Sequence, residues 1–315
     1  MAAAIALGER ARGRTAPNPN VGCLIVKGGR VVGRGWTRPG GRPHAEAMAL
    51  AEAADAAAGA TAFVTLEPCA HASARGPACA DLLAGARVAR VVAAIADPDP
   101  RTDGRGLDRL RSAGIEVTLG PGGADAQRSL AGFLTRQRLG RPFVTLKLAM
   151  SLDGRIALPS GESRWISGEE ARAHAHLERA RADMILVGRG TFEADSPRLD
   201  VRLDGLEDRS PTRAMLTRGE APDGWTTLSA PEGVFGLADV NDLLVEGGAA
   251  AASSFLAADL VDRLLLYRAP ILIGEGKAAL GGIGLAALAD AHGRWRLHDR
   301  RQLGKDTLEV YERAR

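Results

Sequence analysis

Strand-like and helix-like segments alternate through most of the chain, and this alternation limits the architectures open to it. A β-rich run at 61–67 ("TAFVTLE") follows a helical run at 44–59 ("HAEAMALAEAADAAAG"), which we expect to end at Gly59. Residues 21–36 are expected to form a hairpin that turns at Gly28-Gly29. Because strands that alternate with helices are typical of layered folds, we expect a three-layer α/β domain here.

A second α/β unit is expected to begin at Arg141-Pro142. Proline cannot continue the helix expected over about 123–139, and the strand-like run "FVTLKLAM" follows it directly. We therefore divide the chain into domains 1–140 and 141–315. Further strands are expected at 182–188, 213–219, 242–248 and 262–274.

The composition favours a globular enzyme with a small anionic substrate. Of the 315 residues, 45% are hydrophobic, which is enough for two buried cores. Residues 1–145 hold 19 Lys+Arg and 12 Asp+Glu (19 − 12 = +7), and the remainder holds 22 and 26 (22 − 26 = −4). Aromatic residues make up only 4%, which leaves little surface for stacking nucleobases. We therefore expect no nucleic-acid partner.

The three cysteines indicate a reducing compartment. Cys23, Cys69 and Cys79 form an odd and small set, so metal binding or catalysis is favoured over disulfide bonds. Cys23 lies inside a strand-like run and is expected to pack in the core. The N-terminal "MAAAIALGERARGRT" lacks the pattern of a signal peptide, and no run approaches 18 uncharged apolar residues. We expect a cytoplasmic protein without a membrane partner.

One imidazole and two thiols are placed where three zinc ligands could meet. His44 and Glu46 follow Pro43 at the start of a helix, Cys69 follows a strand, and Cys79 begins another helix. Three protein ligands leave a fourth zinc position for water, which then ionises near neutral pH. Glu46 is placed to move protons without binding the metal. This order of residues is the H-x-E…P-C pattern of zinc-dependent nucleobase deaminases.

Other interpretations of these residues remain open from the pattern alone. A non-catalytic zinc module is one alternative, although a closed structural site needs no proton shuttle such as Glu46. Asn18, in "APNPNVG", is placed either to bond a pyrimidine edge or to form an Asx-turn. His71 contacts either the substrate or only its structural neighbours.

Seven motifs follow one another in the order found in the bifunctional riboflavin-biosynthesis deaminase/reductase (RibD) family. The resemblance covers nearly the whole chain, and other zinc deaminases share only its first motifs. The motifs are "NPNVG", "PHAE", "VTLEPCAH", "DPDP…GRGLDRLRSAGIEV", "LKLAMSLDGRIA", "SGESRWIS" and "VEGG".

The resemblance implies two consecutive reactions on phosphorylated pyrimidines. A cytidine-deaminase-like N-terminal domain would use one Zn²⁺ per chain to deaminate 2,5-diamino-6-(5-phosphoribosylamino)pyrimidin-4-one. A dihydrofolate-reductase-like C-terminal α/β domain would use NADPH to reduce the ribosyl group of the product to ribityl. The resemblance also implies a homo-oligomer that associates through the reductase domain.

Residue roles follow by matching the motifs. In the deaminase, His44, Cys69 and Cys79 would bind zinc, Glu46 would be the catalytic proton shuttle, and Asn18 would contact substrate. In the reductase, the cofactor-binding positions are Ala149, Trp165, Thr191, Asp195 and Gly248. The substrate-binding positions of the reductase are Ser163, Arg179, Leu199, Arg202 and Glu246. Lys147 and Asp153 lie in a strong motif, but the motif leaves open which one acts on substrate.

The chain departs from the family pattern at four places. Thr37 stands where a histidine is usual, and Asp200 stands where a threonine is usual. The loop "AHASARGPA" between the two cysteines is one residue longer than usual, and its Arg75 is a candidate replacement for a lost substrate contact. The segment 203–245 is shorter than in most members. This shortening leaves the alternative of a deaminase whose second domain binds but does not reduce. A polynucleotide deaminase is a further alternative, although the basic, aromatic stripe it would need is missing.

Overall fold

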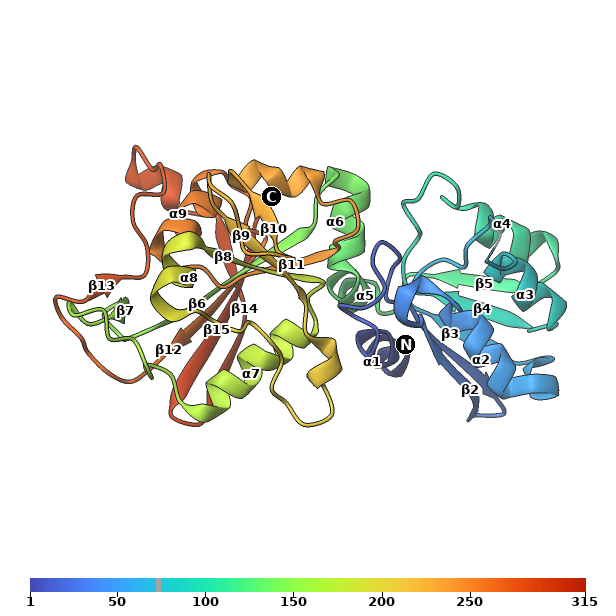
Figure 1. The fold of residues 1–315 in the computed structure, drawn as a ribbon. Coiled ribbons are helices and arrows are strands. Elements are labelled where there is room, and N and C mark those ends of the chain that lie inside the picture. The colour runs from blue at the N-terminus through green and yellow to red at the C-terminus, as the bar shows by residue number, and fades with distance from the viewer. Residues whose placement is uncertain (72–74) are drawn as a thin grey trace. The chain divides into compact units, whose positions relative to one another are not determined.

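The computed structural model describes residues 1–71 and 75–315. It divides into two compact units, Met1–Arg141 and Pro142–Arg315, each with its own sheet (Figure 1). Each unit also has its own cluster of buried apolar side chains, so each can be described by itself. Within the described residues, none of the helices combines the length and the apolar character needed to cross a bilayer.

The first unit has one five-stranded mixed sheet, in the order β2-β1-β3-β4-β5. Strand β1 is antiparallel to β2 and β3, whereas β3, β4 and β5 are parallel. Its elements are α1 (Ala2–Glu9), β1 (Gly22–Lys27), β2 (Arg30–Trp36), α2 (Ala45–Ala53), β3 (Thr61–Val64), α3 (Cys79–Gly85), β4 (Arg90–Ala93), α4 (Arg105–Ser112), β5 (Glu116–Leu119), α5 (Gly123–Ser129) and α6 (Ala131–Leu139).

Helices cover both faces of this sheet because glycines let them approach closely. A Cβ atom on Gly35 of β2 would lie 2.0 Å from the carbonyl oxygen of Ala45 in α2. On β1, a Cβ atom on Gly22 would lie 1.9 Å from the carbonyl oxygen of Ala4 in α1. Helices α2, α3 and α4 pack in a row, and α1 packs beside α5. The expected three-layer α/β domain is confirmed.

The second unit has an eight-stranded sheet, in the order β10-β9-β8-β11-β6-β12-β15-β14. The strands from β10 to β12 are parallel, and β15 and β14 add an antiparallel hairpin. Its elements are β6 (Phe143–Met150), β7 (Arg155–Ala157), α7 (Glu169–Ala180), β8 (Met184–Gly188), α8 (Arg189–Asp195), β9 (Thr212–Leu216), β10 (Thr226–Leu228), β11 (Asp242–Val245), α9 (Ala249–Ala257), β12 (Arg263–Arg268), β13 (Lys277–Ala278), β14 (Trp295–Leu303) and β15 (Asp306–Arg313).

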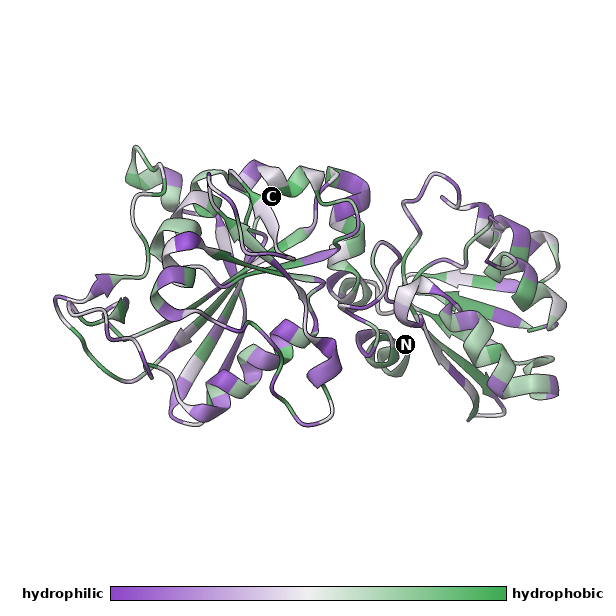
Figure 2. Cartoon of the chain, viewed as in Figure 1, coloured by the Kyte–Doolittle hydropathy of each residue, from purple (hydrophilic) through white to green (hydrophobic). Residues whose placement is uncertain are grey.

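The central parallel strands carry the core of the second unit. Every residue of β11 is buried, and Val144, Leu146 and Leu148 of β6 are buried beside it. Parallel strands covered by helices on both faces are expected to be apolar along their length. Figure 2 shows this distribution, with green hydrophobic residues on the inner strands and purple residues on the outer surfaces of the helices.

Several expected elements differ in extent from those observed. The helix expected over 123–139 is two helices, because Leu130 leaves the helical conformation between α5 and α6. The strand expected over 262–274 is shorter, since β12 ends at Arg268 and Pro270 lacks the N–H that a ladder needs. The hairpin of β14 and β15 was not expected, because charged residues are frequent in both strands.

Candidate functional site

Three sequence-predicted metal ligands lie together in the first unit. The ligand atoms of His44, Cys69 and Cys79 are all within 4.8 Å of one another. Nδ1 of His44 lies 3.3 Å from Sγ of Cys79 and 3.6 Å from Sγ of Cys69. Ligands around a tetrahedral zinc, with bonds of about 2.0 to 2.3 Å, are separated by about 3.5 to 3.8 Å. The donor set and its spacing therefore fit zinc.

Helix α2 fixes the position of two of the predicted residues. His44 is the residue before the first turn of α2, and Glu46 lies within that turn. The side chains of Ala45, Ala49 and Ala53 form the buried face of this helix. Since alanine and the facing glycines of β2 leave little space between helix and strand, the helix start has a closely determined position.

The loop that carries Cys69 is held by the neighbouring residue Glu67. Its buried carboxylate accepts backbone N–H groups of Asp97, Gly104, Gly106 and Leu107, at 2.9 to 3.2 Å. Three of these donors lie at the N-terminus of α4, where N–H groups lack helical partners. No sequence pattern signals this role, because the donors lie 30 to 40 residues further along the chain.

The electrostatics of the cluster suit proton transfer. Glu46 is buried, and this burial raises the pKa of its carboxyl group above the ordinary value. The hydrogen bond between the two thiols lowers the pKa of Cys69 and raises that of Cys79. Within this pair, the thiolate form is therefore favoured at Cys69.

Other sequence-predicted residues of this unit have identifiable neighbours. Asn18 lies against Gly41, where a Cβ atom would come within 2.0 Å of its side-chain nitrogen. Thr37 is buried, and its hydroxyl accepts the N–H of Val21 at 3.0 Å, so this hydroxyl serves the backbone of the hairpin. Arg75 donates to the carbonyl oxygen of Gly40 at 3.0 Å. Part of the loop between the cysteines, residues 72–74, lies outside the described residues.

The structure also places His71 and Cys23. Nδ1 of His71 lies 3.5 Å from the hydroxyl of Thr102, so a structural contact is present whatever else this histidine does. Cys23 is fully buried in the core of the first unit, as expected, and burial raises the pKa of its thiol.

The second unit contains a pocket of about 600 Å³. All ten reductase positions taken from the motifs line it, although they come from segments as far apart as β6 and the start of α9. These residues are Ala149, Ser163, Trp165, Arg179, Thr191, Asp195, Leu199, Arg202, Glu246 and Gly248.

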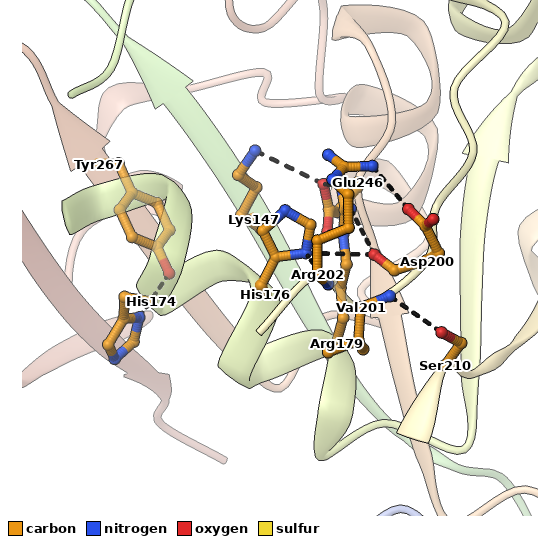
Figure 3. A network of polar contacts seen from close by, with 10 residues as sticks. All are labelled: Lys147, His174, His176, Arg179, Asp200, Val201, Arg202, Ser210, Glu246 and Tyr267. Atoms are coloured by element: carbon orange, nitrogen blue, oxygen red, sulfur yellow. Dashed lines mark hydrogen bonds and ion pairs between the residues drawn. The ribbon is translucent and has the colours of Figure 1, made fainter. Parts of the chain in front are cut away.

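A buried carboxylate is the electrostatic centre of this pocket. Glu246 accepts two bonds from the guanidinium of Arg179, at 2.6 and 2.9 Å, and lies 3.6 Å from Nζ of Lys147 (Figure 3). Burial alone would raise the pKa of Glu246. The two cations more than offset this effect and hold its pKa at about 2.

The structure separates the roles of Lys147 and Asp153, which the sequence left open. Lys147 lines the pocket beside Glu246. Asp153 accepts the N–H groups of Ile273 and Gly274 and the hydroxyl of Ser151, which together lower the pKa of its carboxyl group to about 2. Asp153 therefore fixes a turn, and Lys147 is the member of the motif that faces the pocket.

Polar and aromatic groups complete the pocket wall. The N–H of Gly248, at the start of α9, donates to the hydroxyl of Thr191 at 2.8 Å and so joins two segments of the wall. Trp165 is 67% exposed, with the guanidinium of Arg172 4.7 Å from its ring centroid. A tryptophan that only filled the core would be buried, so the exposed ring is available to a ligand.

Comparison with known sequences finds relatives of both units. Residues 1–95 match the family described as the cytidine and deoxycytidylate deaminase zinc-binding region, and residues 142–230 and 236–308 match the RibD C-terminal domain. Riboflavin biosynthesis protein RibD of Escherichia coli is 40% identical, over 97% of this chain and 96% of that protein. The protein of the same name from Mycobacterium tuberculosis is also 40% identical, over 98% and 95%. The chain belongs to the RibD family.

Solved RibD structures share the whole fold. RibD of Acinetobacter baumannii has a TM-score of 0.89 at 36% identity, over 100% of this chain and 98% of that chain. A Thermotoga maritima protein described as a diaminohydroxyphosphoribosylaminopyrimidine deaminase/5-amino-6-(5-phosphoribosylamino)uracil reductase has a TM-score of 0.90 at 30% identity, over 100% and 97%. The expected fold classes of both domains are therefore confirmed.

The shortened segment of this RibD-family chain does not line the reductase pocket. Residues 203–245 still contribute β9, β10 and β11 to the sheet. Among the described residues, the pocket wall passes from Arg202 directly to Glu246. The pocket wall in this chain is therefore formed without residues 203–245.

Proposed function

We propose that this RibD-family protein catalyses the two reactions that the Thermotoga maritima relative's description names. Residues 1–140 would deaminate 2,5-diamino-6-(5-phosphoribosylamino)pyrimidin-4-one by hydrolysis. Residues 141–315 would reduce the resulting 5-amino-6-(5-phosphoribosylamino)uracil to the ribitylamino phosphate. The observation that carries the proposal is the co-occurrence, in one chain, of the His44–Cys69–Cys79 cluster beside Glu46 and of a separate pocket around Glu246.

The deaminase site is assigned from its donor set. His44, Cys69 and Cys79 would hold Zn²⁺, which when bound provides a water that ionises near neutral pH. Glu46 lies in the first turn of α2, two residues after the predicted ligand His44, and does not belong to the ligand cluster. Its raised pKa allows its carboxylate to accept a proton from the attacking water and then to deliver it to the leaving amine.

The reductase site is assigned from the pocket wall. NADPH supplies the hydride when bound there. Trp165 offers an exposed ring, and Thr191 and Gly248 form a polar wall at the N-terminus of α9, where N–H groups favour anions. Lys147, Arg179 and Glu246 bind and orient the sugar phosphate, with Nζ of Lys147 as a proton donor that faces the pocket.

The deaminase-only alternative is not favoured. This alternative assumes that the shortening of segment 203–245 removes part of the surface that binds the cofactor. The ten motif-derived residues nevertheless line one pocket, and all five cofactor positions, such as Thr191 and Gly248, are among them.

Two variants separate the two activities. Glu46→Gln should lower ammonia release by about 10² to 10⁴-fold while NADPH oxidation with preformed deaminated product persists. Arg179→Gln should lower NADPH oxidation while ammonia release persists. This substitution removes a partner of Glu246, which lies in the reductase pocket. Loss of both activities in either variant, with zinc content and melting temperature unchanged, would contradict the assignment of two separate sites.

Location and assembly are also proposed. The three free cysteines and the small-molecule chemistry support a cytoplasmic enzyme. The family resemblance supports a homo-oligomer that associates through the reductase domain. Light scattering of the full chain after size exclusion should give a multiple of 32.9 kDa, and a monomer at micromolar concentration would contradict the assembly.

A further inference from the structure

Three charged side chains alternate with two buried ones at the pocket wall. Leu199 and Val201 are each 3% exposed, whereas Arg198, Asp200 and Arg202 lie on the more accessible side of the segment. One carboxylate oxygen of Asp200 lies 2.6 Å from a guanidinium nitrogen of Arg198, and the other lies 2.6 Å from one of Arg202. Asp200 therefore bridges two arginines, both of which line the pocket.

The backbone around Asp200 is held from two sides (Figure 3). The carbonyl oxygen of Asp200 accepts a bond from Arg179 at 3.0 Å, and the N–H of Val201 donates to Ser210 at 2.9 Å. The N–H of Arg202 points at Nδ1 of His176, 3.2 Å away. The same Nδ1 atom lies 3.1 Å from the carbonyl oxygen of Asp200, so the ring contacts the backbone on both sides of Val201. Burial and the neighbouring arginines lower the pKa of His176. The carboxylate thus has a defined position between the guanidinium groups.

A phosphate group can exchange with this carboxylate. Two guanidinium groups around one carboxylate offer the same donors that bind a phosphate monoester, which has more charge and one more terminal oxygen. The side chains of Arg198 and Arg202 are 76% and 49% exposed, whereas that of Asp200 is 14% exposed, so the guanidinium groups are open to a ligand from the solvent side. Asp200 also reduces the charge of the three-residue group from +2 to +1.

We propose that Asp200 is a built-in counter-ion that competes with the substrate phosphate for Arg198 and Arg202, and that Arg198 is a phosphate ligand of the reductase pocket. The proposal rests on the proposed function, since it concerns the 5′-phosphate of the reductase substrate. Asp200 stands where threonine is usual in the family. A threonine carries no charge and could not act as such a counter-ion.

The test measures binding of ribose 5-phosphate to the full-length protein by calorimetry, with ribose as the unphosphorylated probe. Asp200→Asn keeps the shape of the side chain and removes its charge, so the Kd of ribose 5-phosphate should fall by about two- to fivefold. The dependence of this Kd on salt should become steeper, because two uncompensated cations then face the ligand.

Asp299→Asn is the matched control. Asp299 pairs with Arg301 at 2.5 Å with the same two-residue spacing, but it lies on β14. Its partner Arg301, unlike Arg198 and Arg202, is not among the residues that line the pocket. This variant should leave the Kd unchanged. Arg198→Gln should raise the Kd of ribose 5-phosphate by about two- to fivefold without changing the response to ribose.

The outcomes separate this proposal from the proposed function. An unchanged or higher Kd in Asp200→Asn overturns the counter-ion role, and an unchanged Kd in Arg198→Gln overturns the ligand role. NADPH oxidation without detectable ribose 5-phosphate binding overturns the phosphate site but leaves the reductase activity standing. Binding in the expected order without NADPH oxidation supports the site and contradicts the reductase activity.

Discussion

Glu246 keeps its charge inside the second unit because Lys147 and Arg179 lie beside it. Its folded pKa of about 2 is below the ordinary value of 4.5, so the charged form stabilises the fold at pH values above 4.5. This contribution, on the order of 3 kcal/mol, is lost as the pH falls through 4.5 towards 2.

The Glu246→Gln variant tests this charge. At pH 7 it should be less stable than the wild type by about 3 kcal/mol, because two cations lose their partner. The difference in melting temperature between the two proteins should narrow as the pH is lowered from 7 to 3. A difference that stays constant over this range would contradict the charge assignment.

At the scale of elements, the zinc cluster depends on how closely α2 packs on β2. Gly35→Ala would place a methyl group 2.0 Å from the carbonyl oxygen of Ala45, next to His44, so the start of α2 must shift. We expect at least a tenfold loss of zinc affinity, on the order of the loss seen when a supporting contact is removed, measured by competition with a chelator dye.

Gly85→Ala is the control for this prediction. Gly85 lies in the last turn of α3 in the same unit, and a Cβ atom there meets nothing within 4 Å. This substitution should keep the zinc affinity and slightly raise the melting temperature, because alanine favours helix. Equal zinc affinity in both variants would show that α2 does not position the metal ligands.

The sequence predicted the elements whose signals are local. The hairpin turn at Gly28-Gly29 and the alternation of strands and helices in the first unit are both visible as residue patterns, and both are observed. The hairpin of β14 and β15 was not predicted, because charged residues such as Arg300 and Glu309 dominate it and pair across the strands. The break at Leu130 has no proline or glycine to signal it.

In the candidate site too, contacts with a local sequence signal were predicted and those without one were not. Residue types and their order predicted the cluster, since His44 precedes a helix, Cys69 follows a strand and Cys79 begins another helix. The cap formed by Glu67 and the bridge formed by Asp200 depend on partners brought close only by the tertiary fold. No sequence pattern gives those contacts, although the unusual Asp200 marked the place where one of them lies.

At the scale of the whole molecule, each site belongs to one unit with its own sheet and buried core. Removal of zinc should therefore abolish ammonia release and leave NADPH oxidation with preformed deaminated product within about twofold of its starting rate. Added Zn²⁺ should restore ammonia release. A parallel loss of both activities on chelation would contradict the independence of the two sites.

We propose that one chain performs both steps in order. The most direct measurement follows ammonia and NADPH together after the phosphoribosyl diaminopyrimidinone is added to the purified wild-type protein. We predict one ammonia and one oxidised NADPH per substrate, with ammonia appearing first. If ammonia appears but NADPH is not oxidised, even when preformed deaminated product is supplied, the proposed reductase activity is contradicted. If no ammonia appears, the proposed deaminase activity is contradicted.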